Sequence, residues 1–311
     1  MHCSTLLKNG GLGFPKLSNI IGLAQLRLGF TLRNQQEGSV ISTISPFSHL
    51  DKFEDGVLKM LEVERPYNLI TLKKKKEQLK EQVFKAWQDQ SSQGKGVSYF
   101  ANDPVANAVF YDDNIFKDNR FIDALRLRTN TAGVRIVLAR SNKDMDKQCR
   151  QCQHPLETLG HVLGQCVAHA RRRIFRHNRI VQILVKHFTL RGYQVVLEPT
   201  IQHNGVTLKP DLIVSRGDVR FVVDVTVRFE DLDMGTSAAQ EKMDKYACLS
   251  SYFTDGKSFS VKPVVLGSRG ALLKETKSFF RKVALSSFIQ KRISLLALSS
   301  SIEILNCHLD Y

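Results

Sequence analysis

Residues 209–227 read Lys-Pro-Asp-Leu-Ile-Val-Ser-Arg-Gly-Asp-Val-Arg-Phe-Val-Val-Asp-Val-Thr-Val. Two apolar runs flank the turn sequence Arg-Gly-Asp, which predicts two neighbouring strands joined by a tight turn. Asp211 lies at the start of the first run and Asp224 lies inside the second. A carboxylate in so apolar a run is costly to bury unless a cation neutralises it. We therefore expect Asp211 and Asp224 to meet at one edge of a sheet and to hold Mg²⁺, which prefers oxygen ligands.

Alternating strand and helix signals surround this stretch. Strands are predicted over residues 193–197, 212–215, 220–228 and 260–266. Helices are predicted over residues 20–32, 71–90, 119–128, 168–188, 237–253 and 276–299. The later elements follow the order helix, strands, helix, strand, helix, which predicts an α/β sandwich of modest size.

The predicted helix over residues 168–188 is strongly basic. Its expected buried face consists of Ile174, Val181, Leu184, Val185 and Phe188. The arginines expected to lie largely outside that face are Arg171, Arg172, Arg173, Arg176 and Arg179. Because guanidinium groups bind phosphates, this helix predicts a surface for the nucleic-acid backbone.

A group of potential metal ligands precedes this helix, with the spacing Cys149-x2-Cys152-x8-His161-x4-Cys166. Such clustering favours a metal site, and so a reducing compartment, over a disulfide framework. Three thiols and an imidazole at these intervals can close a tetrahedron around a structural Zn²⁺ and leave no position open for catalysis. His154 is an alternative fourth ligand, but it lies only two residues after Cys152 and would strain the loop. We therefore expect His161.

A hydrolytic site built on two aspartates also needs a base or a positive charge. Lys242 and Lys245 lie three residues apart on one face of a predicted helix, so either could lean toward the metal site. A lysine there could orient or deprotonate the attacking water and stabilise the developing charge. Glu198, which ends the first predicted strand, is a candidate third acid.

Length and charge agree with a nucleic-acid partner. The chain has 311 residues, enough for two domains. Its 45 Lys and Arg against 30 Asp and Glu give a net charge of +15, which suits a polyanion, although ribosome-associated and peripheral membrane proteins share such a charge. Charged residues interrupt the apolar patches near the N-terminus, so neither a signal peptide nor a membrane span is predicted.

Taken together, these motifs resemble the C-terminal region of site-specific non-LTR retrotransposon polyproteins of the restriction-like endonuclease clade. The resemblance runs across nearly the whole chain. Residues 10–17 resemble the close of that family's reverse-transcriptase thumb, and residues 149–166 resemble its zinc knuckle. The run Arg176-His177-Asn178 resembles the short basic motif that follows, which adds His177 and Asn178 to the expected nucleic-acid contacts.

The family's nuclease motifs are matched in order and spacing by Lys209-Pro210-Asp211, by Asp224 and by Lys242-x2-Lys245-Tyr246. The resemblance implies a PD-(D/E)XK fold. The usual Glu-x-Lys of the second metal strand is altered here to Asp-Val-Thr, with the lysine moved to the next helix. The choice between Lys242 and Lys245 stays open.

The implied organisation has three parts: a helical region left from the polymerase thumb over residues 1–140, a CCHC zinc knuckle over 141–170 and a restriction-like endonuclease over 171–311. The resemblance implies a nuclear enzyme with structural Zn²⁺ and catalytic Mg²⁺ that nicks target DNA, so that the 3′ hydroxyl primes reverse transcription. Its expected partners are DNA, element RNA and a polymerase domain missing from this chain, but no membrane. No reverse transcriptase activity is expected from the chain itself.

The alternative function is a catalytically inactive nucleic-acid-binding fragment of such a polyprotein. The presence of both aspartates and of the lysine pair favours the active nuclease. A misfolding-prone remnant is a third reading. The origin of the chain is likewise open between a degraded element copy, an incomplete gene model and a domesticated nuclease.

Overall fold

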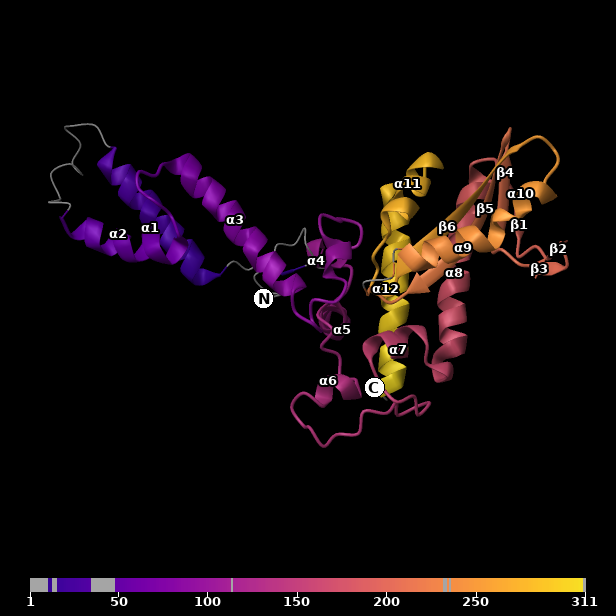
Figure 1. Ribbon diagram of the computed structural model, residues 1–311, viewed down its shortest axis with the longest axis horizontal. Coiled ribbons are helices and arrows are strands. Elements are labelled where there is room, and N and C mark those ends of the chain that lie inside the picture. Colours follow the sequence, from indigo (N-terminus) through magenta and orange to yellow (C-terminus); the bar gives the residue numbers. More distant parts are fainter. Residues whose placement is uncertain are drawn as a thin grey trace. The chain divides into compact units, whose positions relative to one another are not determined.

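A computed structural model of the chain describes residues 11–12, 16–34, 48–112, 114–231, 234 and 236–309 (Figure 1). The chain divides into two compact units, residues 1–89 and residues 90–311. Residues 90–140 thus pack with the knuckle and the sheet, although the sequence grouped them with the N-terminal region. Half of the predicted thumb remnant at residues 10–17 lies outside the described residues, and the three-part division stays a prediction.

The first unit is helical. Its helices are α1 (Leu17–Arg33), α2 (Ser48–Leu61) and α3 (Leu69–Gln88), and the first and third confirm the predicted helices. Helix α3 begins after Asn68, whose side chain accepts a hydrogen bond from the backbone N–H of Thr71 at 2.9 Å, as N-cap residues do. The three helices enclose a small core made of Leu26, Val57, Leu58, Leu61, Val63, Tyr67 and Leu72.

The second unit is built on a four-stranded mixed sheet. Its strands are β1 (Gln194–Leu197), β4 (Leu212–Arg216), β5 (Val219–Arg228) and β6 (Ser258–Gly267). The spatial order is β1-β4-β5-β6, with the first three strands antiparallel and β6 parallel to β5. A separate hairpin consists of β2 (Ile201–His203) and β3 (Val206–Leu208). The four predicted strands are therefore confirmed, and the chain is a mixed α/β protein.

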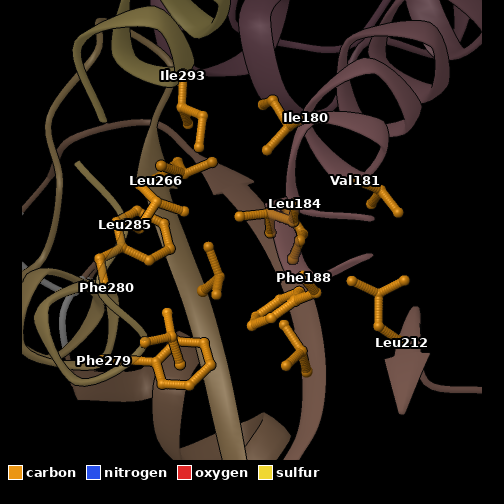
Figure 2. Close-up of a cluster of buried hydrophobic side chains, with 14 of the residues drawn as sticks. Ile180, Val181, Leu184, Phe188, Leu212, Leu266, Phe279, Phe280, Leu285 and Ile293 are labelled. Carbon is orange, nitrogen blue, oxygen red and sulfur yellow. The ribbon is translucent and has the colours of Figure 1, made fainter. Parts of the chain in front are cut away.

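Helices cover both faces of this sheet. One face packs against α8 (Ala170–Leu190), α11 (Lys274–Lys282) and α12 (Ser287–Leu309). Figure 2 shows side chains of α8 facing Leu266, Phe280 and Leu285 across this core. The other face packs against α9 (Thr236–Ala247) and α10 (Leu249–Tyr252). Successive strand residues point to opposite faces, so Val223 lies in the α8 core whereas Val222 packs near Tyr246.

Short helical segments complete the second unit. They are η3 (Val97–Phe100), α4 (Ala108–Tyr111), α5 (Asp118–Arg128), α6 (Arg135–Leu138), α7 (Leu159–Gly164) and η4 (Val167–His169). The buried guanidinium of Arg269 donates to the backbone oxygens of Lys95 (2.7 Å) and Arg128 (3.3 Å). This side chain therefore ties the segment around residues 95–128 to the end of β6.

Two long predicted helices are each divided in the structure. The helix predicted over 237–253 is separated into α9 and α10, and the helix predicted over 276–299 is separated into α11 and α12. Between α11 and α12, Ala284 adopts a left-handed conformation with φ 54°. No glycine or proline marks this position, so the local sequence contains no signal for the break.

The tetrapeptide Phe110-Tyr111-Asp112-Asp113 matches the Tyr/Phe-x-Asp-Asp pattern of polymerases in its letters. Phe110 and Tyr111 belong to helix α4, and Asp112 follows that helix with its carboxylate 3.7 Å from the ammonium of Lys291. Asp113 lies outside the described residues. In this structure the tetrapeptide therefore includes the end of a short helix that packs near α12.

Candidate functional site

The four predicted zinc ligands converge in the structure. The ligand atoms of Cys149, Cys152, His161 and Cys166 all lie within 4.8 Å of one another. The sulfurs of Cys149 and Cys166 are 3.9 Å apart, and the sulfur of Cys152 is 3.2 Å from Nε2 of His161. Two sulfurs bound to one tetrahedral zinc at about 2.3 Å lie about 3.8 Å apart, which matches the first distance. The cluster can therefore hold a metal ion such as zinc.

The two histidines of the knuckle have different places. His161 is nearly buried and belongs to the cluster, as predicted, whereas His154 is exposed and stacks on the His161 ring with centroids 4.2 Å apart. Nδ1 of His154 lies 3.2 Å from the carbonyl oxygen of Leu156. Burial lowers the pKa of His161, which favours the neutral imidazole that binds metals.

A buried carboxylate organises the knuckle loop. Glu157 accepts hydrogen bonds from the backbone N–H groups of Arg135 and Arg150, both at 2.8 Å, and from the Arg150 guanidinium at 2.9 Å. Nε2 of His308, near the end of α12, lies 3.1 Å from the same carboxylate. Burial alone would raise the pKa of Glu157, but the hydrogen bonds from His308 and Arg150 outweigh it and bring the pKa to about 2. The knuckle therefore contacts α12 through a buried carboxylate–histidine pair.

Asp211 directly precedes β4 and Asp224 lies within the adjacent strand β5, as predicted. The last paired residues of β4 and β5 are Leu212 and Val223, so Asp211 and Asp224 are the next pair in the antiparallel register. Oδ2 of Asp211 accepts the backbone N–H of Val225 at 2.6 Å, which holds this carboxylate at the end of the β4–β5 ladder. Both aspartates are mostly buried, with side chains 17% and 6% exposed.

Helix α9 brings one of the two predicted lysines to this pair. Nζ of Lys242 lies 3.1 Å from Oδ1 of Asp224, whereas Nζ of Lys245 lies 4.9 Å from the centre of the Tyr246 ring. The hydroxyl of Tyr246 donates to Oδ2 of Asp224 at 2.7 Å. Burial and this hydrogen bond raise the pKa of Tyr246, so the phenol stays protonated and serves as a donor. Asp224 therefore has a cation on one oxygen and a neutral donor on the other.

The contacts of His177 and Glu198 could not be predicted from the sequence. Nε2 of His177, on α8, lies 3.1 Å from Oδ1 of Asp211, so this residue faces the aspartates rather than an external surface. The hydrogen bond to Asp211 raises the pKa of His177 despite partial burial. Glu198 is exposed, and among the described residues it forms no three-ligand cluster with Asp211 and Asp224. Its backbone N–H donates to the carbonyl oxygen of Asp211 at 2.8 Å.

Sequence reasoning missed two contacts of the aspartates, those made by Tyr246 and His177. Tyr246 was noted only as part of the lysine motif, yet its hydroxyl contacts Asp224. The signal was present in the spacing, because Lys242 and Tyr246 are four residues apart and so share a helix face. His177 had no comparable signal, since its contact with Asp211 joins elements that are distant in the chain.

The basic face of α8 is smaller than predicted. Arg171, Arg172 and Asn178 are exposed, and Arg173 is half-buried with its guanidinium on the carbonyl oxygen of Cys166. Arg176 is 1% exposed, so the prediction that it lies outside is wrong. Its guanidinium donates to Ser301 Oγ at 2.7 Å and to the Leu163 carbonyl oxygen at 3.1 Å, because α12 and the knuckle pack over this part of α8.

The apolar face of α8 also differs from the prediction at one position. Val181, Leu184 and Phe188 are buried as expected, and Val185 is half-buried. Ile174 is 58% exposed, so its assignment to the core is wrong.

In the described part of the chain, every helix is too short or too polar to cross a membrane.

Comparison with known proteins identifies relatives of the chain. No protein-family model matches it. It is 28% identical over 144 residues to the retrovirus-related Pol polyprotein from the type-2 retrotransposable element R2DM of Drosophila melanogaster, an alignment that covers 46% of this chain and 13% of that protein. It is 30% identical over 180 residues to the retrovirus-related Pol polyprotein from a type-1 retrotransposable element R2 of Popillia japonica, covering 56% of this chain and 37% of that protein.

The matched stretches thus span far less than two thirds of the length of these relatives. A further Pol polyprotein from an R2 element of Popillia japonica is 29% identical over 157 residues, which cover 48% of this chain and 26% of that protein. Homologues of the chain are therefore the Pol polyproteins of R2 non-LTR retrotransposons, and the chain matches a fragment of such a polyprotein.

Proposed function

We propose that the second unit is a restriction-like, metal-dependent DNA endonuclease of a non-LTR retrotransposon. The observation that carries the proposal is that Asp211, just before β4, lies opposite Asp224, within β5, where the β4–β5 pairing ends, with the ammonium of Lys242 3.1 Å from Asp224. A mixed sheet covered by helices on both faces is compatible with the PD-(D/E)XK fold. In this proposal the nick exposes a 3′ hydroxyl that primes reverse transcription by a polymerase outside this chain. The nuclear location that such a substrate requires stays a prediction.

The donor set fits a hard divalent cation. Mg²⁺ keeps several waters and is usually held by one or two carboxylates together with substrate phosphate. Asp211 and Asp224 would be those carboxylates. When bound there, Mg²⁺ would neutralise the phosphate charge and lower the pKa of a bound water.

The surrounding side chains would position the substrate and the carboxylates. The ammonium of Lys242 has three N–H donors, and Asp224 accepts one of them. The other donors can therefore bind a phosphate oxygen. Tyr246 and His177 hold the two carboxylates from opposite helices, α9 and α8. Such fixed donors and charges stabilise a transition state because they need no reorganisation during the reaction.

The knuckle contributes a structural zinc site in this proposal. All its four ligands are supplied by the chain, which leaves no open coordination position for chemistry. Exposed Arg171, Arg172 and Asn178 follow it directly on α8 and would contact the DNA backbone. The knuckle and this helix would then place the duplex over the aspartates.

A plasmid-nicking assay with Mg²⁺ at low salt tests the proposal. Asp211→Asn and Asp224→Asn keep the shape of each side chain but remove its charge, so each is expected to reduce the nicking rate about a thousandfold with DNA binding retained. Asp255→Asn, an exposed aspartate paired with Arg220, is the matched control and should nick like the parent. If the parent binds DNA and never cuts it with Mg²⁺ or Mn²⁺, the chain is an inactive nucleic-acid-binding fragment instead.

The two lysines of α9 are expected to behave differently in the same assay. Lys242→Gln should lower the nicking rate about a hundredfold, because it removes the charge next to Asp224. Lys245→Gln, one helical turn away with its ammonium over the Tyr246 ring, should change the rate less than about threefold. The opposite ranking would assign the catalytic charge to Lys245, and circular dichroism of both variants controls for folding.

A further inference from the structure

A groove runs between two helices of the second unit, away from the aspartates. Helices α8 and α12 pack side by side (Figure 1). Together with residues 115–120 they line an open groove of about 940 Å³. Along α8 its lining extends from Phe175 to Leu190, which is about 22 Å at ~1.5 Å rise per residue. Of the residues that line this groove, the knuckle and the nuclease proposal use only Asn178.

The groove carries unpaired positive charge. Its lining contains Arg120, Arg179, Lys186 and Arg292, against a single carboxylate, Glu303. Arg120 pairs with Glu303 at 3.3 Å. In the part of the chain that the structure describes, no carboxylate lies within ion-pair distance of the other three cations. Three free cations along one groove are complementary to a chain of phosphates.

An exposed aromatic ring lies in the same groove. Phe175 is 58% exposed, and the guanidinium of Arg179 lies 5.5 Å from the centre of its ring. The polar side chains of Asn178 and Gln182 lie in the same lining. An aromatic ring beside free cations offers a stacking surface for a nucleobase next to contacts for the phosphates.

We propose that the α8–α12 groove binds a single strand of DNA, with phosphates on Arg179, Lys186 and Arg292 and a base stacked on Phe175. A cleft between helices whose axes lie about 8–10 Å apart is too narrow for a duplex. At the ~3.4 Å rise of a fully stacked strand, a length of about 22 Å fits at most about six nucleotides.

The choice of DNA rests on the proposed nuclease function. His177, which contacts Asp211, and Arg179, which lines the groove, lie two residues apart on α8. Residues two positions apart on a helix project from different sides of it, so a DNA strand separated near the proposed cleavage site would pass around α8 to reach the groove. The groove would hold that strand while the aspartates act on the duplex next to it.

Fluorescence anisotropy with a labelled DNA single strand of about 16 nucleotides tests the charge contacts. The measurements use the full chain in EDTA over a range of salt concentrations, so cleavage plays no part. Arg179→Gln with Arg292→Gln should weaken binding about tenfold and reduce the slope of log K against log salt by about 1.4, because each phosphate contact on a single strand contributes about 0.7. The matched control, Lys274→Gln with Arg281→Gln, changes two exposed cations of α11 outside the groove and should leave the slope unchanged.

Stacking is tested separately at the exposed ring. Phe175→Leu should weaken single-strand binding at least about fivefold, whereas Phe175→Tyr should retain it. Phe288→Leu is the control, because Phe288 is 73% exposed and lies outside the groove. Both phenylalanines are on the surface, so neither change should alter the thermal unfolding of the protein.

Three results would overturn the proposal: an unchanged salt slope in the arginine variant, an equal loss of affinity in Phe175→Leu and Phe288→Leu, or tighter binding of duplex DNA or of single-stranded RNA through the same residues. A chain that never nicks plasmid but shows the expected losses would refute the nuclease and leave the groove assigned. If the chain nicks plasmid normally and these variants bind a single strand as the parent does, the nuclease proposal is supported and the groove proposal is refuted.

Discussion

Removal of the metal from the knuckle is expected to lower the melting temperature of the second unit by at least about 10 °C, since metal ligation contributes folding free energy directly. The four ligand atoms gathered within 4.8 Å would lose their common partner. The effect should extend beyond the knuckle, because Glu157 contacts both the knuckle loop and His308 of α12. Calorimetry of the full chain with and without a zinc chelator measures the change, and elemental analysis should find one zinc per chain beforehand.

A pair of cysteine variants makes this prediction specific. Cys166→Ser should contain no zinc and should melt like the chelated protein, since Cys166 is a buried ligand of the cluster. Cys248→Ser changes an exposed thiol on another element and should keep both zinc content and melting temperature. Equal zinc content in the two variants would show that the cluster is not a metal site.

Replacement of Glu230 by glutamine is expected to destabilise the second unit by about 3–5 kcal/mol, the usual effect of breaking a buried ion pair from one side. Glu230 and Arg269 are both fully buried, with Nε of Arg269 3.1 Å from the carboxylate. The same carboxylate accepts the backbone N–H of Arg269 at 2.8 Å. A Cβ atom on Gly267 would lie 1.9 Å from Oε1 of Glu230, so the backbone here leaves no room to rearrange. Calorimetric melting of the full chain measures the loss.

The matched control is an ion pair of the same type at the surface. Arg228 and Glu241 pair at 2.9 Å with side chains about half exposed, so Glu241→Gln should cost less than about 1 kcal/mol. A loss for Glu230→Gln no larger than for Glu241→Gln would mean that Arg269 finds other acceptors. Its guanidinium already donates to the backbone oxygens of Lys95, Leu127, Arg128 and Glu230.

The strands and the aspartate pair were accessible to sequence reasoning because their signals are local. Apolar runs separated by a tight turn predicted β4 and β5 as neighbours, and strand pairing then required Asp211 and Asp224 to approach each other. The knuckle followed in the same way from ligand spacing. In each case the residues that determine the outcome lie within about twenty positions of one another.

The choice between the lysines needed the packing of α9. Lys242 and Lys245 lie on the same broad face, and only the burial of Tyr246 against the sheet turns Lys242 toward Asp224. The placement of His177 at Asp211 depends in turn on how α8 crosses the end of β4. Neither orientation is encoded in the spacing of the residues themselves.

The remaining differences have the same physical origin. Arg176 is buried and Ile174 is exposed because the knuckle and α12 cover one side of the N-terminal half of α8, whereas helical periodicity considers the helix alone. The break at Ala284 likewise lacks a local signal, although Val283 and Leu285 on either side of it are buried in the core. Local sequence patterns were thus enough to predict the four strands of the sheet, the Cys/His cluster and the aspartate pair. The side chains that complete the site were selected by contacts between distant elements, since the free energy of burial depends on what packs against a residue and not on its neighbours in the chain.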